Sequence, residues 1–243
     1  MPIEVVNIKP SRVFLAMPCT DGIAPETMMA AEMCLEPNSL TQVERRSVMT
    51  SLLANQFNEL WVQCLNEREE KGFTEFAMIH ADVSSEPGWL DKMIRERKRI
   101  GVDLLSAAVA VKNMSGDVSM AVQDLKTEAI QRLNLKELRK LPPTFTIEDL
   151  RPGNSKNYGL CLNTGLWVID IDKVGKLQDA DKSKPFVWFE VRDTIHHDGK
   201  KYVARNLPED WFFSIQCRQR GLKLAATRAI KVRHRGFWWF DNQ

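Results

Sequence analysis

The sequence predicts an α/β fold in which a mainly parallel central sheet is flanked by helices. Short apolar runs of strand length alternate along the chain with longer segments whose apolar residues recur every three or four positions. This order of strand, helix, strand, helix and strand is typical of a parallel sheet with crossover helices. With 243 residues, of which 44% are hydrophobic, the chain can bury a core without disulfides. We expect a single domain over residues 1–243.

The N-terminal half of this pattern lies between residues 13 and 125. Strands are expected where an apolar run stops at a polar loop, and helices where apolar residues line one face. In order, these elements are the strand Val13–Met17, the helix Ser51–Arg68, the strand Phe76–Ile79, a helix from Trp89 to just before Gly101, and the strands Leu104–Val111 and Val118–Val122. Parallel strands place their carboxyl ends at one edge of the sheet, so we expect the loops that follow them to meet there.

The pattern weakens over residues 126–158, where prolines and a glycine interrupt short helical pieces. We expect an irregular insertion or lid in this segment. Regular elements return over residues 159–243, as the strand Leu166–Ile169, a hairpin of Phe186–Ile195 and Tyr202–Ala204 around an Asp-Gly turn, a helix from Pro208 to Gly221, and the strands Leu224–Ala226 and Ile230–Val232.

Charge and cysteine content exclude several classes of protein. Lys and Arg number 34 against 32 acidic residues, and a net charge of +2 is too even to indicate a nucleic-acid partner. The longest nearly apolar run, Leu104–Val111, is shorter than the ~18 residues of a membrane span, and the first residues lack the apolar stretch of a signal peptide. We therefore expect a cytoplasmic protein. Five cysteines without a Cys-x-x-Cys pair predict free thiols.

Polar residues follow one of the predicted strands in a pattern that suits a cation. His80 and Asp82 are separated by one residue, so in an extended chain their side chains leave the strand end on the same face. A carboxylate suits Mg²⁺ or Mn²⁺, and an imidazole favours Mn²⁺. The alternative is that Asp82 caps a turn and that His80 is a hydrogen-bonded core histidine.

Two other groups of polar residues are candidates for chemistry. His234 lies between Arg233 and Arg235, a cluster that suits a phosphate or a metal, or else a solvated basic tail. Glu209 and Asp210 open a helix, where they are suited to act as a general base or only to complement the helix dipole. Gly-x-Gly-x-x-Gly, Walker, His-Glu-x-x-His and Gly-x-Ser-x-Gly motifs are missing, which disfavours the large enzyme classes that use them.

Taken in order, these motifs resemble the GT-A fold glycosyltransferases, and in particular the inverting group called family 2. The resemblance implies a Rossmann-like sandwich that binds a nucleotide-diphospho-sugar. The segment "FAMIHADVSSEPGWLDKM" stands where the family has its metal-binding Asp-x-Asp motif, with His80 in place of the first Asp and Asp82 in place of the last. The segment "VRHRG" resembles the strand end where many of these enzymes place a metal-binding histidine, which implies His234.

The resemblance also implies roles for residues around these motifs. In the family, residues 13–125 would form the nucleotide-sugar-binding half and residues 159–243 the acceptor-side half. "PEDWFFSIQCRQRGLKLAAT" resembles the helix that carries the catalytic base, which implies Asp210, with Glu209 as the second candidate. The implied donor-binding residues are Pro18, Thr20, Asp21, Gly22, His80, Asp82, Asn163, Thr164, Gly165, Arg233 and Arg235. Trp89 and Trp211 offer flat faces for an acceptor, although tryptophans in such helices usually belong to the core.

The expected function is therefore a glycosyltransferase that uses Mn²⁺ or Mg²⁺ and moves a sugar from a nucleotide-sugar donor, with UDP as the expected nucleotide, to a hydroxyl acceptor with inversion. The acceptor is left open between a glycan, a protein, a metabolite and a nucleic-acid base, and in a retaining enzyme Asp210 would only position it. One alternative is a nucleotidyltransferase, which usually has a glycine-rich loop with a basic residue after the first strand. The other is a non-catalytic sugar-nucleotide-binding module whose metal site has decayed, an alternative suggested by His80.

Overall fold

A seven-stranded central sheet organises the described part of the chain, which in the computed structural model comprises residues 10–180, 183, 186–197, 199–236 and 239–242. The strand order is β2-β1-β3-β10-β5-β13-β8. The strands are β1 (Arg12–Cys19), β2 (Gln42–Met49), β3 (Glu75–Ile79), β5 (Leu104–Ala107), β8 (Thr144–Phe145), β10 (Leu166–Asp170) and β13 (Leu224–Thr227). β1 is parallel to β2 and β3, and β5 is parallel to β13, whereas β10 and β8 are antiparallel to their neighbours. The predicted α/β class with a largely parallel sheet is confirmed.

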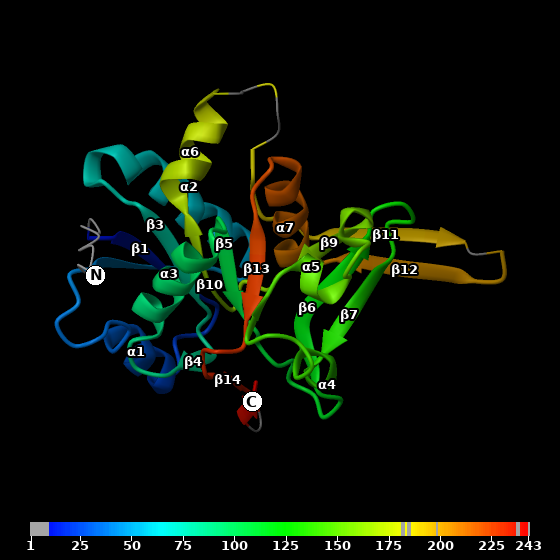
Figure 1. Cartoon of the computed structure of the whole chain (residues 1–243), viewed down its shortest axis with the longest axis horizontal. Coiled ribbons are helices and arrows are strands. Elements are labelled where there is room, and N and C mark those ends of the chain that lie inside the picture. The colour runs from blue at the N-terminus through cyan, green and yellow to red at the C-terminus, as the bar shows by residue number, and fades with distance from the viewer. Residues whose placement is uncertain (1–9, 181–182, 184–185, 198, 237–238, 243) are drawn as a thin grey trace, which may run out of the picture.

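Helices cover both faces of this sheet (Figure 1). Successive residues of β1 point to opposite faces, so Val13 and Leu15 belong to one apolar cluster and Phe14 and Ala16 to the other. The helices α1 (Pro25–Glu32) and α3 (Trp89–Ile100) pack into the first cluster, whereas α2 (Leu53–Lys71), α6 (Ile171–Ala180) and α7 (Glu209–Gln219) pack into the second. All five cysteines are buried free thiols, as expected.

Three smaller sheets complete the described structure. One contains β6 (Asp117–Asp124), β7 (Ile130–Asn134) and β9 (Tyr158–Cys161), and another contains β4 (Val83–Ser85), β14 (Val232–Arg235) and β15 (Trp239–Asp241). The strands β11 (Arg192–His197) and β12 (Tyr202–Leu207) form the predicted hairpin, which projects from the body of the molecule in Figure 1. Asp198 of the predicted turn lies outside the described residues.

The segment 126–158 is more regular than predicted. It contains β7 and β8, the short helices α4 (Leu135–Leu138) and α5 (Ile147–Leu150), and the 3-10 helix η1 (Ser155–Asn157). Both short helices begin with a capping box, in which the side chains of Asn134 and Thr146 accept backbone N–H groups of the first turn and an acidic side chain accepts the cap N–H. Local capping and pairing with β6 and β13 order these short elements, and the prediction of an insertion or lid stays a prediction.

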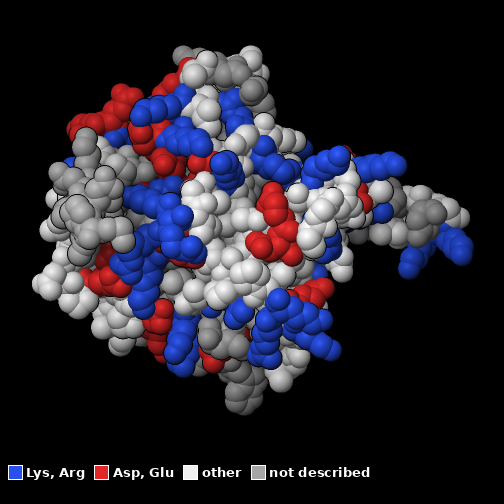
Figure 2. Space-filling view, viewed as in Figure 1, with Lys and Arg blue, Asp and Glu red and all other residues white. Residues whose placement is uncertain are grey.

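None of the helices that the structure describes is both long enough and apolar enough to cross a lipid bilayer. Basic and acidic side chains form separate groups on the face shown in Figure 2.

Candidate functional site

The candidate metal ligands come together at the carboxyl end of β3. His80 directly follows β3, and Asp82 precedes β4. β14 pairs antiparallel with β4 and places His234 directly opposite Val83. His234 Nε2 then lies 3.5 Å from Asp82 Oδ2, although the two residues are far apart in the sequence. The structure therefore brings together the polar residues that sequence reasoning singled out on two separate motifs.

The hydrogen bonds of His234 indicate which ring nitrogen carries the proton. Nδ1 lies 2.7 Å from the carbonyl oxygen of Ala110, which only accepts, so we assign the proton to Nδ1. In the neutral ring, Nε2 is then an acceptor that faces the Asp82 carboxylate. Two acceptors at this separation require a proton or a cation near them, so Asp82 and His234 form a site for positive charge.

Lys112 supplies a positive charge at this point, and sequence reasoning missed it. Its Nζ contacts the same Oδ2 atom of Asp82 that faces His234. Burial raises the pKa of Asp82, but Lys112 and His234, when His234 carries a second proton on Nε2, outweigh this effect and hold the pKa well below its usual range. Lys112 directly follows the third predicted strand, Leu104–Val111. This position could have marked it as a candidate site residue, because His80 was found in the same way, as a polar residue after a strand end.

His80 itself is held in place by the loop that precedes β10. Its backbone N–H donates to the Gly165 carbonyl at 3.0 Å, and its Nε2 lies 3.2 Å from Thr164 Oγ1. Burial lowers the pKa of His80 to about 4, in spite of the nearby Asp82 carboxylate. His80 is therefore neutral at physiological pH, and it is hydrogen-bonded but only half-buried, so it is not a fully buried core histidine.

Among the described residues, no group of three or more His, Cys, Asp and Glu side chains is arranged to hold a metal ion. Asp82 and His234 offer two ligands, and Lys112 already contacts the carboxylate oxygen between them. A resident divalent ion would have to displace this ammonium group. The donor set therefore does not fit a resident Mn²⁺ or Mg²⁺.

A pocket of about 540 Å³ opens beside these residues. The loop after β1 forms one wall, and the His80–Asp82 segment together with Arg235 forms another. The predicted donor-binding residues that line it are Pro18, Thr20, Asp21, Gly22, His80, Asp82 and Arg235. Gly22 has φ +121°, a conformation that side-chain-bearing residues rarely adopt, so this loop requires glycine at that position.

Asn163 is buried and holds the loop that contacts His80. Asn163 is 2% exposed, donates from Nδ2 to the Ala107 carbonyl at 2.7 Å, and accepts the Gly165 N–H at 2.9 Å. Gly165 packs closely against Val109. The prediction that Asn163 contacts the donor was wrong in this respect, because its side chain is buried and fixes the loop that positions His80.

The Glu209–Asp210 pair begins α7, as predicted. Asp210 is 8% exposed and accepts the backbone N–H of Trp211 at 2.7 Å. Burial and the adjacent Glu209 carboxylate raise the pKa of Asp210 well above its usual value, and burial also raises that of Glu209. Ser214 donates to the Asp210 carbonyl and accepts the Leu162 N–H, both at 2.9 Å, which ties the first turns of α7 to the loop next to His80.

Three other predicted residues lie elsewhere. Trp89 is completely buried and donates from Nε1 to the Ala30 carbonyl at 2.9 Å, so the prediction of an acceptor contact was wrong. Arg233 pairs with Asp241 at 3.1 Å and lines a separate pocket beside α1. Trp211 is 7% exposed and lines a different cleft of about 630 Å³ between the β6–β7 and β11–β12 hairpins.

Comparisons with known proteins support the fold alone. No family model matches the sequence, and no curated protein matches it. Among solved structures, the crystal structure of A197 from STIV aligns with a TM-score of 0.51, covering 93% of this chain and 86% of that chain at 12% sequence identity. Likeness at so low an identity shows a shared mixed α/β architecture and carries no information about activity.

Proposed function

We propose that this protein is a glycosyltransferase that transfers a sugar from a nucleotide-diphospho-sugar, with UDP as the expected nucleotide, to a hydroxyl acceptor with inversion. The observation that carries the proposal is the pocket at the carboxyl ends of β1 and β3, which Asp82 and Arg235 line and beside which Lys112 and His234 lie against Asp82. In α/β sheets, ligands bind at this edge, and about 540 Å³ lies within the ~300–1,000 Å³ typical of small-molecule sites.

The charges suit a diphosphate leaving group. When the bond between the anomeric carbon and the phosphate oxygen breaks, its electron pair remains on the diphosphate, and nearby cations stabilise the added negative charge. Arg235 lines the pocket, and Lys112 and His234 lie beside Asp82. The motifs that contain Asp82 and His234 are also the ones that resemble the GT-A fold glycosyltransferases of family 2.

Asp210 is the proposed general base. Its carboxylate would take the proton from an acceptor hydroxyl while that oxygen forms a bond to the anomeric carbon on the face opposite the leaving diphosphate. A raised pKa makes a carboxylate a stronger base, as this step requires. Trp211, the residue after Asp210, lines a cleft that offers space for the acceptor.

Arg235 and Arg233 provide a matched pair of variants for testing the nucleotide site. Both lie on β14, but Arg235 lines the main pocket whereas Arg233 lines a separate one. Calorimetric titration of UDP and of GDP should show binding of one nucleotide to the wild type. We expect Arg235→Gln to weaken this binding ~10-fold, the effect of one lost charge-assisted hydrogen bond, and Arg233→Gln to leave it unchanged.

Three results would contradict the proposal. If neither nucleotide binds, the pocket is not a nucleotide site. Equal weakening by both arginine variants would indicate a general effect of surface charge instead of recognition in the pocket. Binding without release of nucleotide from any UDP- or GDP-sugar would favour the non-catalytic module over the enzyme.

A further inference from the structure

The segment that follows β5 positions both Lys112 and His234 beside Asp82. The segment after β5 is anchored by an isolated bridge between Ala110 and Val118 and by a hydrogen bond of 2.9 Å from the Val111 N–H to the Asp117 carbonyl. The Ala110 carbonyl accepts the Nδ1 proton of His234, and Lys112 follows two residues later. One anchored segment therefore positions both partners of the carboxylate.

The ammonium group of Lys112 has donors to spare. An ammonium carries three N–H groups, and among the described residues this one contacts the Asp82 carboxylate. The side chains of Lys112 and Asp82 are each 39% exposed, and Asp82 lines the adjacent pocket. A diphosphate would meet an anionic carboxylate here, and a cation between the two anions removes their repulsion.

We infer that Lys112 takes the place of a divalent cation at Asp82, so that its ammonium group bridges the carboxylate to the diphosphate of the nucleotide. This inference rests on the proposed nucleotide-sugar function and makes its donor site independent of metal. It departs from the metal dependence that the sequence resemblance implies. The reason is that Lys112 already contacts the Asp82 oxygen that faces His234, which is the point where a metal ion would bind.

Titrations of nucleotide with and without Mn²⁺ test the inference. We would use UDP or GDP, whichever binds the wild type more tightly, in EDTA and then in Mn²⁺. The wild-type affinity should agree within ~3-fold between the two conditions, whereas Lys112→Met should bind ~10- to 100-fold more weakly in EDTA, as expected for loss of charge-assisted hydrogen bonds. Mn²⁺ should restore much of the affinity of Lys112→Met, because Asp82 and His234 then become available to the ion.

Two control variants separate charge from general effects. Lys112→Arg keeps a cation at this position and should retain binding in EDTA. Lys126→Met removes an exposed lysine from the turn between β6 and β7 and should behave like the wild type. Thermal unfolding of each variant should show that the fold is intact.

A second readout does not depend on the nucleotide. Mn²⁺ binding without nucleotide can be measured by electron paramagnetic resonance. The wild type and Asp82→Asn should give the same signal, because no Mn²⁺ ion should be bound at Asp82. A stoichiometric Mn²⁺ site lost in Asp82→Asn, or nucleotide binding that requires Mn²⁺ in the wild type, would overturn the role of Lys112 and leave the nucleotide-sugar function standing. Failure of both nucleotides to bind in either condition would overturn the proposed function and this inference with it.

Discussion

Replacing Asp210 with Asn is expected to lower the rate of sugar transfer by ~10²- to 10⁴-fold while nucleotide affinity stays within ~3-fold of wild type. The substitution preserves the size of the side chain and its ability to accept the Trp211 N–H, but it removes the basic carboxylate. The rate can be measured as release of UDP from a UDP-sugar, with water as acceptor. Glu209→Gln is the control at the second candidate for the base. It should have a much smaller effect if Asp210 is the base.

The pH dependence of the reaction gives an independent measurement of the same role. Since burial raises the pKa of Asp210 well above its usual value, the folded enzyme retains the proton on this carboxyl to higher pH than an exposed aspartate does. The base is active only when deprotonated, so kcat/KM should rise with pH through that raised pKa. A rate that is flat across this range, or that persists in Asp210→Asn, would contradict the assignment.

The buried carboxylate also predicts an effect of Asp210→Asn on stability. A folded-state pKa above the unfolded-state value means that the folded protein binds more protons between the two pKa values, so stability falls as pH rises through that interval. The neutral amide avoids this loss. Asp210→Asn should therefore be more stable than wild type at pH 8, by ~0.5–2 kcal/mol in urea denaturation, with a smaller difference at pH 4. If Asp210→Asn is no more stable than the wild type at pH 8, the ionised Asp210 carboxylate does not destabilise the fold.

Much of the fold could be predicted because hydrophobic pattern and burial agree in its central elements. The runs around Phe14, Phe76 and Leu105 are buried strands, and the helical spacing around Trp61 marks the buried face of α2. The pattern failed where elements lie at the periphery. The edge strand β2 contains the consecutive charged residues Glu44, Arg45 and Arg46 and has no fully buried residue, and the sequence analysis did not predict it or the helices α1 and α6.

The candidate site was predictable in part for a similar reason. His80 and Asp82 follow a recognisable strand, and the resemblance pointed to His234, but only strand pairing between β4 and β14 shows that they meet. Lys112 could not be placed at Asp82 from its sequence position, because the contact depends on the path of the chain after β5. Trp89 illustrates the opposite error, since its place among apolar residues at helical spacing already favoured the core.

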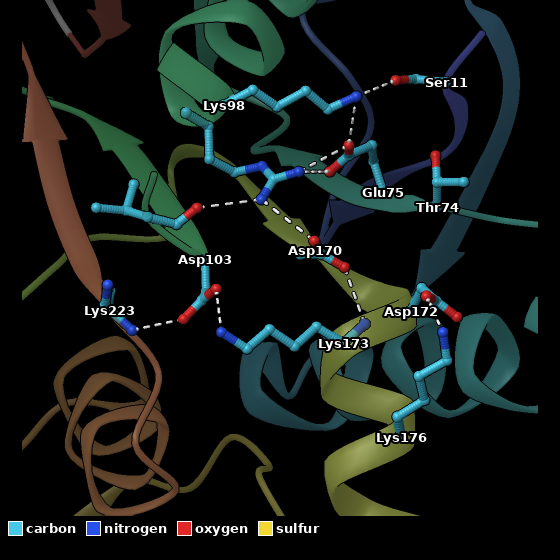
Figure 3. A network of polar contacts seen from close by, with 12 residues as sticks. Ser11, Thr74, Glu75, Lys98, Asp103, Asp170, Asp172, Lys173, Lys176 and Lys223 are labelled. Carbon is cyan, nitrogen blue, oxygen red and sulfur yellow. Dashed lines mark hydrogen bonds and ion pairs between the residues drawn. The ribbon is translucent and has the colours of Figure 1, made fainter. Parts of the chain in front are cut away.

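The amino edge of the central sheet contains a buried ion pair whose loss should have the largest effect on stability (Figure 3). Glu75 is 1% exposed and Arg97 is 4% exposed, and Arg97 Nη2 lies 2.8 and 2.9 Å from the two carboxylate oxygens of Glu75. Arg97 Nη1 also donates to the Val102 carbonyl at 3.1 Å. Removing Arg97 leaves the buried Glu75 carboxylate with the partly exposed Lys98, whose Nζ lies 3.4 Å from Glu75 Oε1, as its remaining cation among the described residues.

Arg97→Met is therefore expected to reduce the free energy of unfolding by ~3–5 kcal/mol at pH 7.5, measured by urea denaturation. Arg99→Met is the matched control on the same helix. The Arg99 side chain is 66% exposed and pairs with Glu96 at 2.7 Å, so its loss should cost no more than ~1 kcal/mol. A similar loss in both variants would show that the buried pair has no special role.

The pH dependence of this loss tests its cause. Burial raises the pKa of Glu75 above its usual value even with Arg97 and Lys98 beside it, and removal of Arg97 should raise it further. Because an acid with a raised folded-state pKa destabilises the fold as pH rises through that interval, the deficit of Arg97→Met should shrink as pH falls from 7.5 to 5. The double variant Glu75→Gln with Arg97→Met should recover part of the stability at pH 7.5, since no charge then remains buried. A deficit independent of pH, and unrelieved in the double variant, would mean that lost packing of the arginine side chain, and not an unpaired carboxylate, accounts for the effect.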